Sequence, residues 1–495
     1  MPDAARALAF AALFGAAAQL LFFRHGPGLN VLLAAALFIL LAWTHRARDR
    51  AIDRRDLWIP AGAALFAAFS AVRADVMLLA FDLLAAFALT VATVVVSSGV
   101  RVMDLPAFRL MAEGSGAIGA LLVRATSVLA TAWPFLGSVL GARATRASGY
   151  AAGLLLAVPF LFVFAALFGS ADAVFARTLA DAFDVRRWLD TLGDLPGRVV
   201  VGAVAAWSAA GALYRLRAEP RVPLSGRPRG WLGVEPATVA LLAIDALFAV
   251  FVVLQVAYLF GGRDTVEAAR LSYSAYARRG FFELITVTML VGGLLFIAEL
   301  AVRRRARTFV IAALALVGLS GVVLLSAAYR LDLYQRAYGW TEQRFYALAM
   351  IVFLAAALGI LAWSLLRGTM SWTLQPLSIA ALTVAAAVNA MAPSEYVVRA
   401  NVARVLDPGS LPADAERGLD AWYVSTLGDG AVPLLIEALP SLPEPERSRL
   451  GTRLRQDLEA RVRTPQPWQS WNVDRERARR ALIDARAELM RYPAR

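Results

Sequence analysis

Long apolar blocks alternate with short polar segments along most of the chain. Each block holds about 16 to 25 residues, and a helix of about 20 apolar residues crosses the hydrocarbon core of a bilayer. The pattern therefore predicts an all-α, polytopic membrane helix bundle of about eleven spans in residues 1–393. The predicted spans are Ala7–Phe23, Pro27–Thr44, Leu57–Val72, Val76–Val100, Tyr150–Phe168, Val199–Tyr214, Pro236–Phe260, Phe281–Val302, Phe309–Tyr329, Phe345–Leu366 and Trp372–Ala392.

One apolar block does not fit this alternation. Residues 117–140 are long enough to cross a membrane, but they contain Arg124 and many small polar residues. A span here would invert every later loop and would place the arginine-rich loops on both sides of the membrane. We therefore predict that residues 117–140 are interfacial or re-entrant on the cytoplasmic side.

The chain after Met391 has a different pattern. Residues 394–495 are rich in arginine and in acidic residues, and apolar residues recur there at spacings of three and four. This predicts a small, all-helical extramembrane domain. An odd number of spans puts this domain on the side opposite to the N-terminus, where it is a candidate docking site for a protein partner.

Composition supports a membrane protein and excludes several kinds of chemistry. The chain is 59% hydrophobic, whereas soluble domains are about 45–50% apolar. All 50 basic residues are arginines and the net charge is +13, but most arginines lie in short loops, which favours membrane orientation over nucleic-acid binding. The absence of lysine and cysteine excludes a P-loop lysine, a Schiff base and disulfides. His25 and His45 lie at opposite ends of one span, too far apart to share a metal, so we predict no metal site and no cofactor.

The arginine-rich loops predict the orientation of the protein. Residues 45–56, 214–229 and 303–307 carry five, five and four arginines. Alternating spans put all three loops on one side, which the positive-inside rule assigns to the cytoplasm. We therefore predict a multi-pass protein of the bacterial cytoplasmic (inner) membrane, with a cytoplasmic N-terminus and an extracytoplasmic C-terminal domain.

Two motifs carry charges at the ends of two neighbouring spans. SYSAYARRGFFELI (272–285) and YRLDLYQRAYGWTEQRFYAL (329–348) are about equally far from the turn at 303–307, so an antiparallel hairpin brings both to the outer membrane face. A negative charge is favoured at a helix N-terminus and a positive charge at a C-terminus. The predicted cluster consists of Tyr276, Arg278, Arg279, Glu283, Arg330, Asp332, Tyr334 and Arg344.

This cluster has two interpretations. In the first it is a structural lock, in which ion pairs join the helix ends and tyrosines form an interfacial belt. In the second it binds an anionic lipid or a phosphate, because guanidinium groups match the geometry of phosphate. A separate intramembrane acid, Asp245, lies near the middle of its span. It is either a neutral, hydrogen-bonded acid or a site for a proton or a cation.

Several motifs resemble those of a bacterial integral-membrane family. YARRGFFEL, YRLDLYQRAYGWTEQRFYAL and GSADAVFA, followed by EYVVRANVARVL and WQSWNVDRERARRAL, are similar to the family named domain of unknown function 4173, a relative of the family numbered 4153. The resemblance implies a helical membrane protein and no particular activity. It also implies that the two charged motifs belong to the family pattern.

Three functions remain open. The first is a binding, sensing or scaffold protein that recognises an anionic lipid or ligand at the outer face. The second is a transporter or channel that uses Asp245, although the sequence has no visible internal repeat. The third is a membrane enzyme acting on a lipid-linked substrate, with Glu283 and Asp332 as acid and base. The first external loop, RHGPGLN, lacks the acidic pair that many such glycosyl transferases carry, so we favour a binding role over an enzyme.

Overall fold

Helices account for nearly all of the ordered structure. The computed structural model describes residues 2–46, 52–123, 194–217, 232–260, 281–302, 306–368, 372–411, 418–463 and 466–493. Within these ranges the only β pairing is an isolated bridge between Leu232 and Val302. The predicted all-α class is therefore confirmed.

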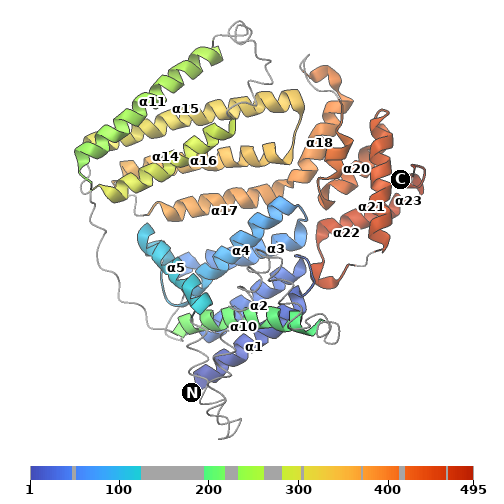
Figure 1. The fold of residues 1–495 in the computed structure, drawn as a ribbon, viewed down its shortest axis with the longest axis horizontal. Helices are drawn as coiled ribbons and strands as arrows, with labels where there is room; N and C mark the ends of the chain where they lie inside the picture. Colours follow the sequence, from blue (N-terminus) through green and yellow to red (C-terminus); the bar gives the residue numbers. More distant parts are fainter. Residues whose placement is uncertain are drawn as a thin grey trace, which may run out of the picture.

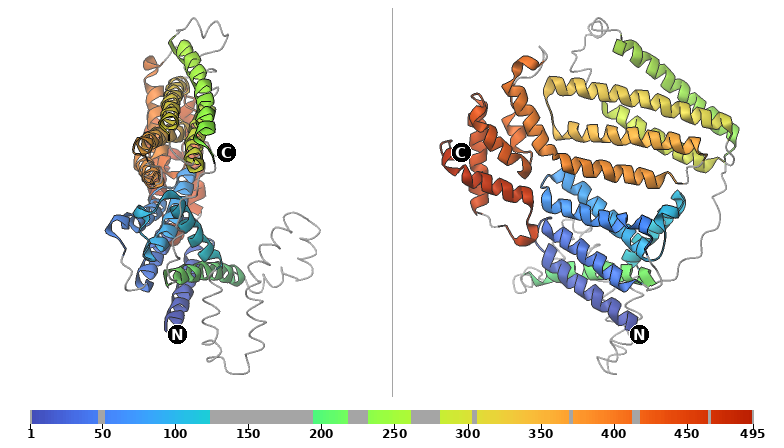
Figure 2. Two further views of the ribbon diagram at one scale, coloured as in Figure 1. Left: turned by 90° about the vertical axis from the view of Figure 1, so that its left-hand side faces the viewer. Right: turned by 180° about the vertical axis from the view of Figure 1, so that it is seen from behind.

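Two groups of long helices lie beside each other, and a domain of shorter helices lies at one end of both (Figure 1). The first group comprises α1 (Pro2–Phe22), α2 (Leu29–His45), α3 (Trp58–Val72), α4 (Val76–Ser97), α5 (Ala107–Val123) and α10 (Leu195–Arg217). The second comprises α11 (Val234–Phe260), α14 (Phe281–Ala301), α15 (Arg307–Tyr338) and α16 (Glu342–Leu366). Between them, α17 (Leu374–Met391) packs on both α16 and α4. Seen from the side, the long helices form a thin slab (Figure 2).

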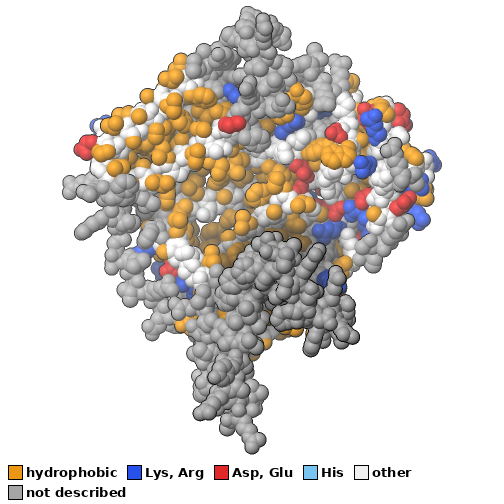
Figure 3. All heavy atoms as spheres, in the orientation of Figure 1, with side chains coloured by type: hydrophobic (Ala, Val, Ile, Leu, Met, Phe, Trp, Pro, Cys, Tyr) orange, Lys and Arg blue, Asp and Glu red, His pale blue; other side chains and the backbone are white. Residues whose placement is uncertain are grey.

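The long helices have the character of membrane spans. Six described helices are long and apolar enough to cross a bilayer: Val76–Ser97, Gly197–Leu216, Val234–Val253, Arg307–Tyr338, Glu342–Leu366 and Leu374–Met391. Two shorter apolar helices, Arg6–Phe22 and Leu29–His45, lie beside them. Leu247, Leu290 and Leu325 are 68%, 67% and 71% exposed, and Figure 3 shows a broad apolar surface over the long helices. Such a surface is expected to face lipid, so the protein is embedded in a membrane.

Two predicted blocks lie wholly or partly outside the described residues. The span predicted at 150–168 is one of them, and so is most of the block at 117–140. Residues 117–123 belong to α5, which packs on α10 and α4. Close to its C-terminal end, the backbone of Ala120 is so near to Gly211 of α10 that a Cβ atom on Gly211 would clash with it.

Small residues allow α1 and α10 to pack backbone to backbone. A Cβ atom on Gly15 would lie 2.5 Å from the carbonyl oxygen of Gly202, a close approach that is typical of membrane helix pairs. The ion pair between Arg24 and Asp194, 2.9 Å long, joins the end of α1 to the start of α10. These contacts make α10 antiparallel to α1.

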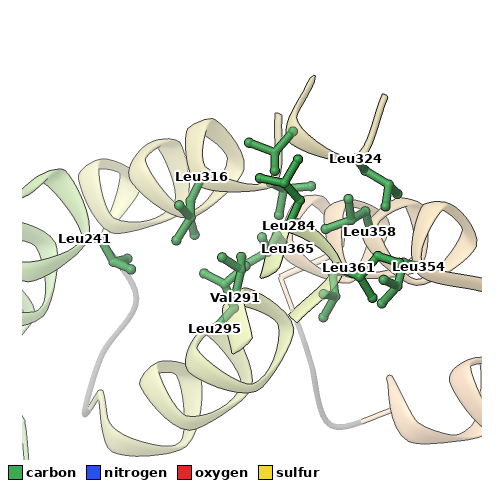
Figure 4. Packing of buried hydrophobic residues seen from close by; sticks show 14 of the residues in the cluster. Leu241, Leu284, Val291, Leu295, Leu316, Leu324, Leu354, Leu358, Leu361 and Leu365 are labelled. Carbon is green, nitrogen blue, oxygen red and sulfur yellow. The ribbon is translucent and has the colours of Figure 1, made fainter. Parts of the chain in front are cut away.

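The second group has the largest buried apolar cluster among the described residues. Leu295, Leu316 and Leu365 are each at most 2% exposed and come from α14, α15 and α16. Figure 4 shows these leucines converging from three helices, together with Leu241 of α11. Packing of this kind fixes the ends of α14, α15 and α16 relative to one another.

Helix α15 is longer than the predicted span. It continues for nine residues past Tyr329 and ends at Tyr338, because no helix breaker occurs before Gly339. Gly339 has a φ of 75°, a left-handed conformation that glycine adopts without strain. The polar motif at 329–338 is therefore a helical extension rather than a loop.

The chain direction alternates between two ends of the helix groups. One end, here called the docking end, holds the turns between α1 and α2, α3 and α4, and α15 and α16, together with the end of α17. The opposite end holds Arg54, Arg55, Arg101 and Arg367 in its short connections.

The C-terminal domain covers the docking end. It consists of α18 (Pro393–Leu406), α19 (Ala421–Ser425), α20 (Val432–Ala438), α21 (Glu446–Arg463), α22 (Val473–Asp484) and α23 (Arg486–Leu489), with short 3-10 turns such as η7 (Trp468–Ser470). It has a buried core of its own, which includes Leu435, Leu439 and Leu450. The predicted all-helical character of this domain is confirmed.

Candidate functional site

Asp75 joins both helix groups to the C-terminal domain. It caps α4, because its Oδ1 accepts a 3.0 Å hydrogen bond from the backbone N–H of Leu78. The same oxygen accepts a 3.0 Å bond from the hydroxyl of Tyr346 on α16, and Oδ2 accepts a 3.1 Å bond from Ser394 on α18. The Glu342 carboxyl lies near Asp75 and Ser394, at the start of α16. Asp75 and Glu342 are therefore two acids close together at the docking end.

Arg73, two residues before Asp75, also contacts both a membrane helix and the C-terminal domain. Its Nε donates a 3.0 Å hydrogen bond to the carbonyl oxygen of Asn389 at the end of α17. Its Nη1 lies 3.4 Å from a Glu395 carboxylate oxygen and 3.7 Å from Asp474 of α22. One guanidinium therefore joins the α3–α4 turn to the end of α17 and to two elements of the C-terminal domain.

These contacts form one polar cluster, here called the docking junction, in which Asp75, Ser394 and Asp474 are buried and the other members are half-buried. Its members are Arg73, Asp75, Glu342, Tyr346, Ser394, Glu395 and Asp474. Burial raises the pKa of the Asp474 carboxyl to about 6, while the Arg73 guanidinium and the backbone amide of Ala74 act in the opposite direction. The docking junction holds four carboxyl groups and one arginine, so its stability depends on how many protons the acids carry.

Helix α18 holds the turn between α15 and α16. Asn401 accepts a hydrogen bond from the backbone N–H of Trp340 and donates one to its carbonyl oxygen, each 2.8 Å long. Arg404 donates to the carbonyl oxygens of Gln335, Arg336 and Ala337. A cationic side chain at these terminal carbonyls satisfies acceptors that the helix itself leaves open.

The segment from η7 to α22 holds the loops of the first helix group. The backbone N–H of Leu29 donates a 2.9 Å hydrogen bond to the carbonyl oxygen of Trp471. The Ser470 hydroxyl donates a 3.0 Å hydrogen bond to the carbonyl oxygen of Gly26, and the Arg475 guanidinium donates a 3.1 Å hydrogen bond to the carbonyl oxygen of Pro27. The C-terminal domain therefore contacts the docking-end turns of both helix groups, and it does so mainly through buried or half-buried polar groups.

The structure describes only some residues of the predicted outer cluster. Tyr276, Arg278 and Arg279 lie outside the described residues. Glu283 is exposed in the first turn of α14, whereas Arg330 is 8% exposed within α15. A binding surface shared by Glu283 and Arg330 stays a prediction.

The remaining members of that cluster form local pairs. Asp332 is ion-paired with Arg336 one turn later, at 2.9 Å. The rings of Tyr334 and Tyr338 are 5.0 Å apart, and the guanidinium carbon of Arg344 lies 4.0 Å from the Tyr334 ring centroid. Arg344 also donates a hydrogen bond to the carbonyl oxygen of Gly339. This arginine is positioned by an aromatic ring and a turn, as in many anion sites.

Asp245 is buried within α11. The residue is 7% exposed, and neither of its carboxylate oxygens has a hydrogen-bond partner among the described residues. The described residues therefore do not supply the hydrogen bond that the first alternative requires, and both alternatives for Asp245 stay predictions.

A cavity of about 620 Å³ lies in the C-terminal domain beside η7. Its lining includes the apolar residues Leu458, Leu482 and Ile483 and the basic residues Arg461 and Arg479. Two tryptophans at its edge, Trp468 and Trp471, are 53% and 42% exposed. Among the described residues, no group of three or more acids or histidines is placed to hold a metal ion.

Sequence reasoning missed most of the docking junction. The segment VRAD (72–75) reads as a charge-balanced turn, and Asp82 reads as a packing residue. The sequence feature that could have pointed to the junction is the group of polar residues where apolar spans end, in VRAD and in NAMAPSEY (389–396). That signal marks helix ends without showing which ends meet.

Fold and site together define a helical integral membrane protein with an extramembrane domain held against its spans. A protein-family model described as Domain of unknown function (DUF4153) matches residues 60–438, and the chain belongs to this family. The matching family is thus the one numbered 4153, and a relation to 4173 is not shown. The match includes every residue of the docking junction except Asp474. No curated protein and no solved structure matches the chain.

Proposed function

We propose that the protein is a binding or sensing protein of the membrane surface, and that its ligand carries a phosphate, as an anionic lipid headgroup does. The observation that carries this proposal is the position of the C-terminal domain across the docking-end turns of both helix groups. A ligand bound at the docking end would contact all three parts, so its binding would alter how they pack. This is the arrangement that a sensor or a scaffold needs.

Arg344 is the described residue best suited to bind the phosphate. Its guanidinium carbon lies 4.0 Å from the centroid of the Tyr334 ring and 6.0 Å from that of Tyr338. The predicted neighbours Arg278 and Arg279 would add charge from the segment before α14. Planar guanidinium groups bind phosphate oxygens in pairs, and a preorganised arginine loses less entropy on binding.

Binding of defined probes to the full-length protein in phosphatidylcholine nanodiscs tests this proposal. Short-chain phosphatidylglycerol and inorganic phosphate are titrated separately, which distinguishes a lipid headgroup from a free anion. We expect Arg344→Ala to weaken binding about tenfold or more, the effect of losing about 1.4 kcal/mol. The matched control is Arg367→Ala, because Arg367 packs on Trp363 at 4.4 Å near the other end of α16. Equal affinities for Arg344→Ala and the wild type would refute the proposal.

The docking end is, on this proposal, the extracytoplasmic face of a bacterial inner membrane. The short connections with Arg54, Arg55, Arg101 and Arg367 lie at the other end, as the positive-inside rule requires of the cytoplasmic side. The chain has no cysteine, so single cysteines report sidedness directly. Asp484→Cys should react with an impermeant maleimide in intact cells, and Arg101→Cys should react only after lysis. The reverse pattern would overturn the orientation.

Transport is the second candidate, and the isolated, buried Asp245 favours it. A carboxyl group without a hydrogen-bond partner in the middle of a span can take up and release a proton or a cation. Flux of protons or sodium ions into proteoliposomes would then be lost in Asp245→Asn. Absence of flux in the wild-type protein would dismiss this candidate.

A further inference from the structure

Asp82 and Asn389 form a buried pair between the first helix group and α17. They are 0% and 1% exposed. The side-chain amide of Asn389 donates a 2.7 Å hydrogen bond to Oδ1 of Asp82 and a 3.1 Å bond to the carbonyl oxygen of Ala385. Asp82 lies six residues into α4, on the order of 9 Å from its start, so the pair lies beneath the docking junction.

Two oxygen atoms of this pair have no donor among the described residues. They are Oδ2 of Asp82 and Oδ1 of Asn389. A buried acceptor without a donor costs about 1–3 kcal/mol, and more if it is charged. Both atoms belong to the two groups that already share the 2.7 Å hydrogen bond, so one missing hydrogen atom accounts for both.

The charged and titratable groups around Asp82 do not neutralise it. Arg73 of the α3–α4 turn directs its Nε to the backbone oxygen of Asn389, and no ion pair joins a described arginine to Asp82. Asp75 at the start of α4 adds negative charge, and Tyr346 of α16 donates its hydroxyl to Asp75. An ionised Asp82 would therefore be a buried anion close to a second acid.

We propose that Asp82 is a proton-binding site, in which a carboxylic acid O–H on Oδ2 donates a hydrogen bond to Oδ1 of Asn389. The proton comes from solvent and returns to it, and no other bond changes. Acid and amide then form a pair with two hydrogen bonds. Divalent cations such as Ca²⁺ take about six to eight oxygen ligands, so the two available oxygens suit a proton better than such a cation.

Loss of this proton would reach the C-terminal domain through α17. Asn389 is in the last turn of α17, and its backbone oxygen is the acceptor for Arg73. Helix α18 follows within a few residues and carries Ser394, which binds Asp75. Deprotonation would leave two unpaired acceptors and a negative charge between α4 and α17. If these two helices moved apart as a result, the contacts of the docking junction would loosen. This inference concerns the membrane core and does not depend on the proposed phosphate ligand.

Infrared spectroscopy of the full-length protein in nanodiscs tests the site. Wild-type protein at neutral pH should show a carboxylic-acid carbonyl band that Asp82→Asn removes and the control Asp484→Asn, at an exposed acid, retains. Asp82→Asn should fold, because its amide can also donate to Oδ1 of Asn389. Its thermal midpoint should change less than that of the wild type as the pH rises above neutrality. Identical acid bands in wild type and Asp82→Asn would overturn the proposal, as would a sodium-dependent stabilisation that requires Asp82.

A second variant covers the case in which Asp82→Asn does not fold. Asn389→Leu removes the proposed acceptor and keeps the acid, so the frequency of one acid band should shift. No shift in any acid band would count against the acid–amide pair.

Discussion

The side-chain amide of Asn472 donates a 2.8 Å hydrogen bond to the carbonyl oxygen of Arg73, 399 residues earlier in the chain. The same amide donates a second 2.8 Å hydrogen bond to the carbonyl oxygen of Ser70. It therefore binds both the last turn of α3 and the loop that follows it. Its Oδ1 caps α22 by accepting hydrogen bonds from the backbone N–H groups of Asp474 and Arg475. One buried side chain thus starts a helix of the C-terminal domain and binds that domain to a membrane helix.

Variants of Asn472 separate these two roles. Asn472→Asp keeps the capping oxygen but removes the amide donors, leaving two carbonyl groups without this partner at a cost of about 1–3 kcal/mol each. Asn472→Ala also removes the cap, which adds about 1 kcal/mol. We expect both variants to expose the C-terminal domain to protease and to lower the thermal midpoint, with the larger effect in Asn472→Ala.

The matched control is Asp420→Ala. Asp420 caps α19 by accepting a 2.9 Å hydrogen bond from the backbone N–H of Tyr423. Its side chain has no hydrogen bond or ion pair with the described parts of the helix groups. This variant should lose about 1 kcal/mol and keep the domain docked. If Asn472→Asp behaves like Asp420→Ala, the docking role of the amide is wrong.

Gly28 should tolerate no side chain, whereas Gly26 in the same loop should tolerate one. A Cβ atom on Gly28 would lie 2.6 Å from the carbonyl oxygen of Trp471 and 2.7 Å from the backbone of Ser470. On Gly26 the nearest atom would be the Ser470 hydroxyl at 3.9 Å, an ordinary contact. We expect Gly28→Ala to push η7 away from α2 and to increase hydrogen exchange at the Leu29 amide, while Gly26→Ala leaves it unchanged. Equal exchange in both variants would contradict the close approach.

The membrane architecture was largely predictable because its signals are local. Block length and apolarity predicted helices such as α4 and α16. The pairs Asp332–Arg336 and Tyr334–Tyr338 follow from helical spacing once α15 is known to continue past Tyr329. The sequence did not predict that continuation, because charged residues after an apolar run resemble a loop.

The docking junction was not predictable. Its residues are far apart in the sequence, and the residue type at each position is common at the ends of membrane helices. Asp75 and Ser394 are polar residues at the ends of apolar blocks, and nothing in their local sequence distinguishes them. Their contact requires the ends of α3 and α17 and the starts of α4 and α16 to lie at one level, which periodicity does not specify. The same applies to Asp82 and Asn389, which are 307 residues apart.

Asp474 should make docking weaker as the pH rises. Its pKa in the folded protein is about 6 because of burial, above the value of about 3.9 for an unfolded aspartate. Stability from this group is therefore complete below about pH 4 and is lost as the pH rises through about 6, by roughly 3 kcal/mol at most. The difference in unfolding free energy between wild type and Asp474→Asn should follow this curve. A difference that favours the wild type as the pH rises would show that the ion pair with Arg73 outweighs burial.

The exposed tryptophans beside η7 should lie at the level of the lipid headgroups. Gln469, between them, donates a 3.4 Å hydrogen bond to the carbonyl oxygen of Leu20 near the end of α1, and tryptophan is enriched where membrane meets water. In nanodiscs, lipids brominated near the glycerol should quench wild-type fluorescence more than they quench Trp468→Phe/Trp471→Phe. Lipids brominated near the chain ends should quench both proteins equally, and they serve as the control. Equal quenching by the shallow label would place this edge of the C-terminal domain away from the bilayer.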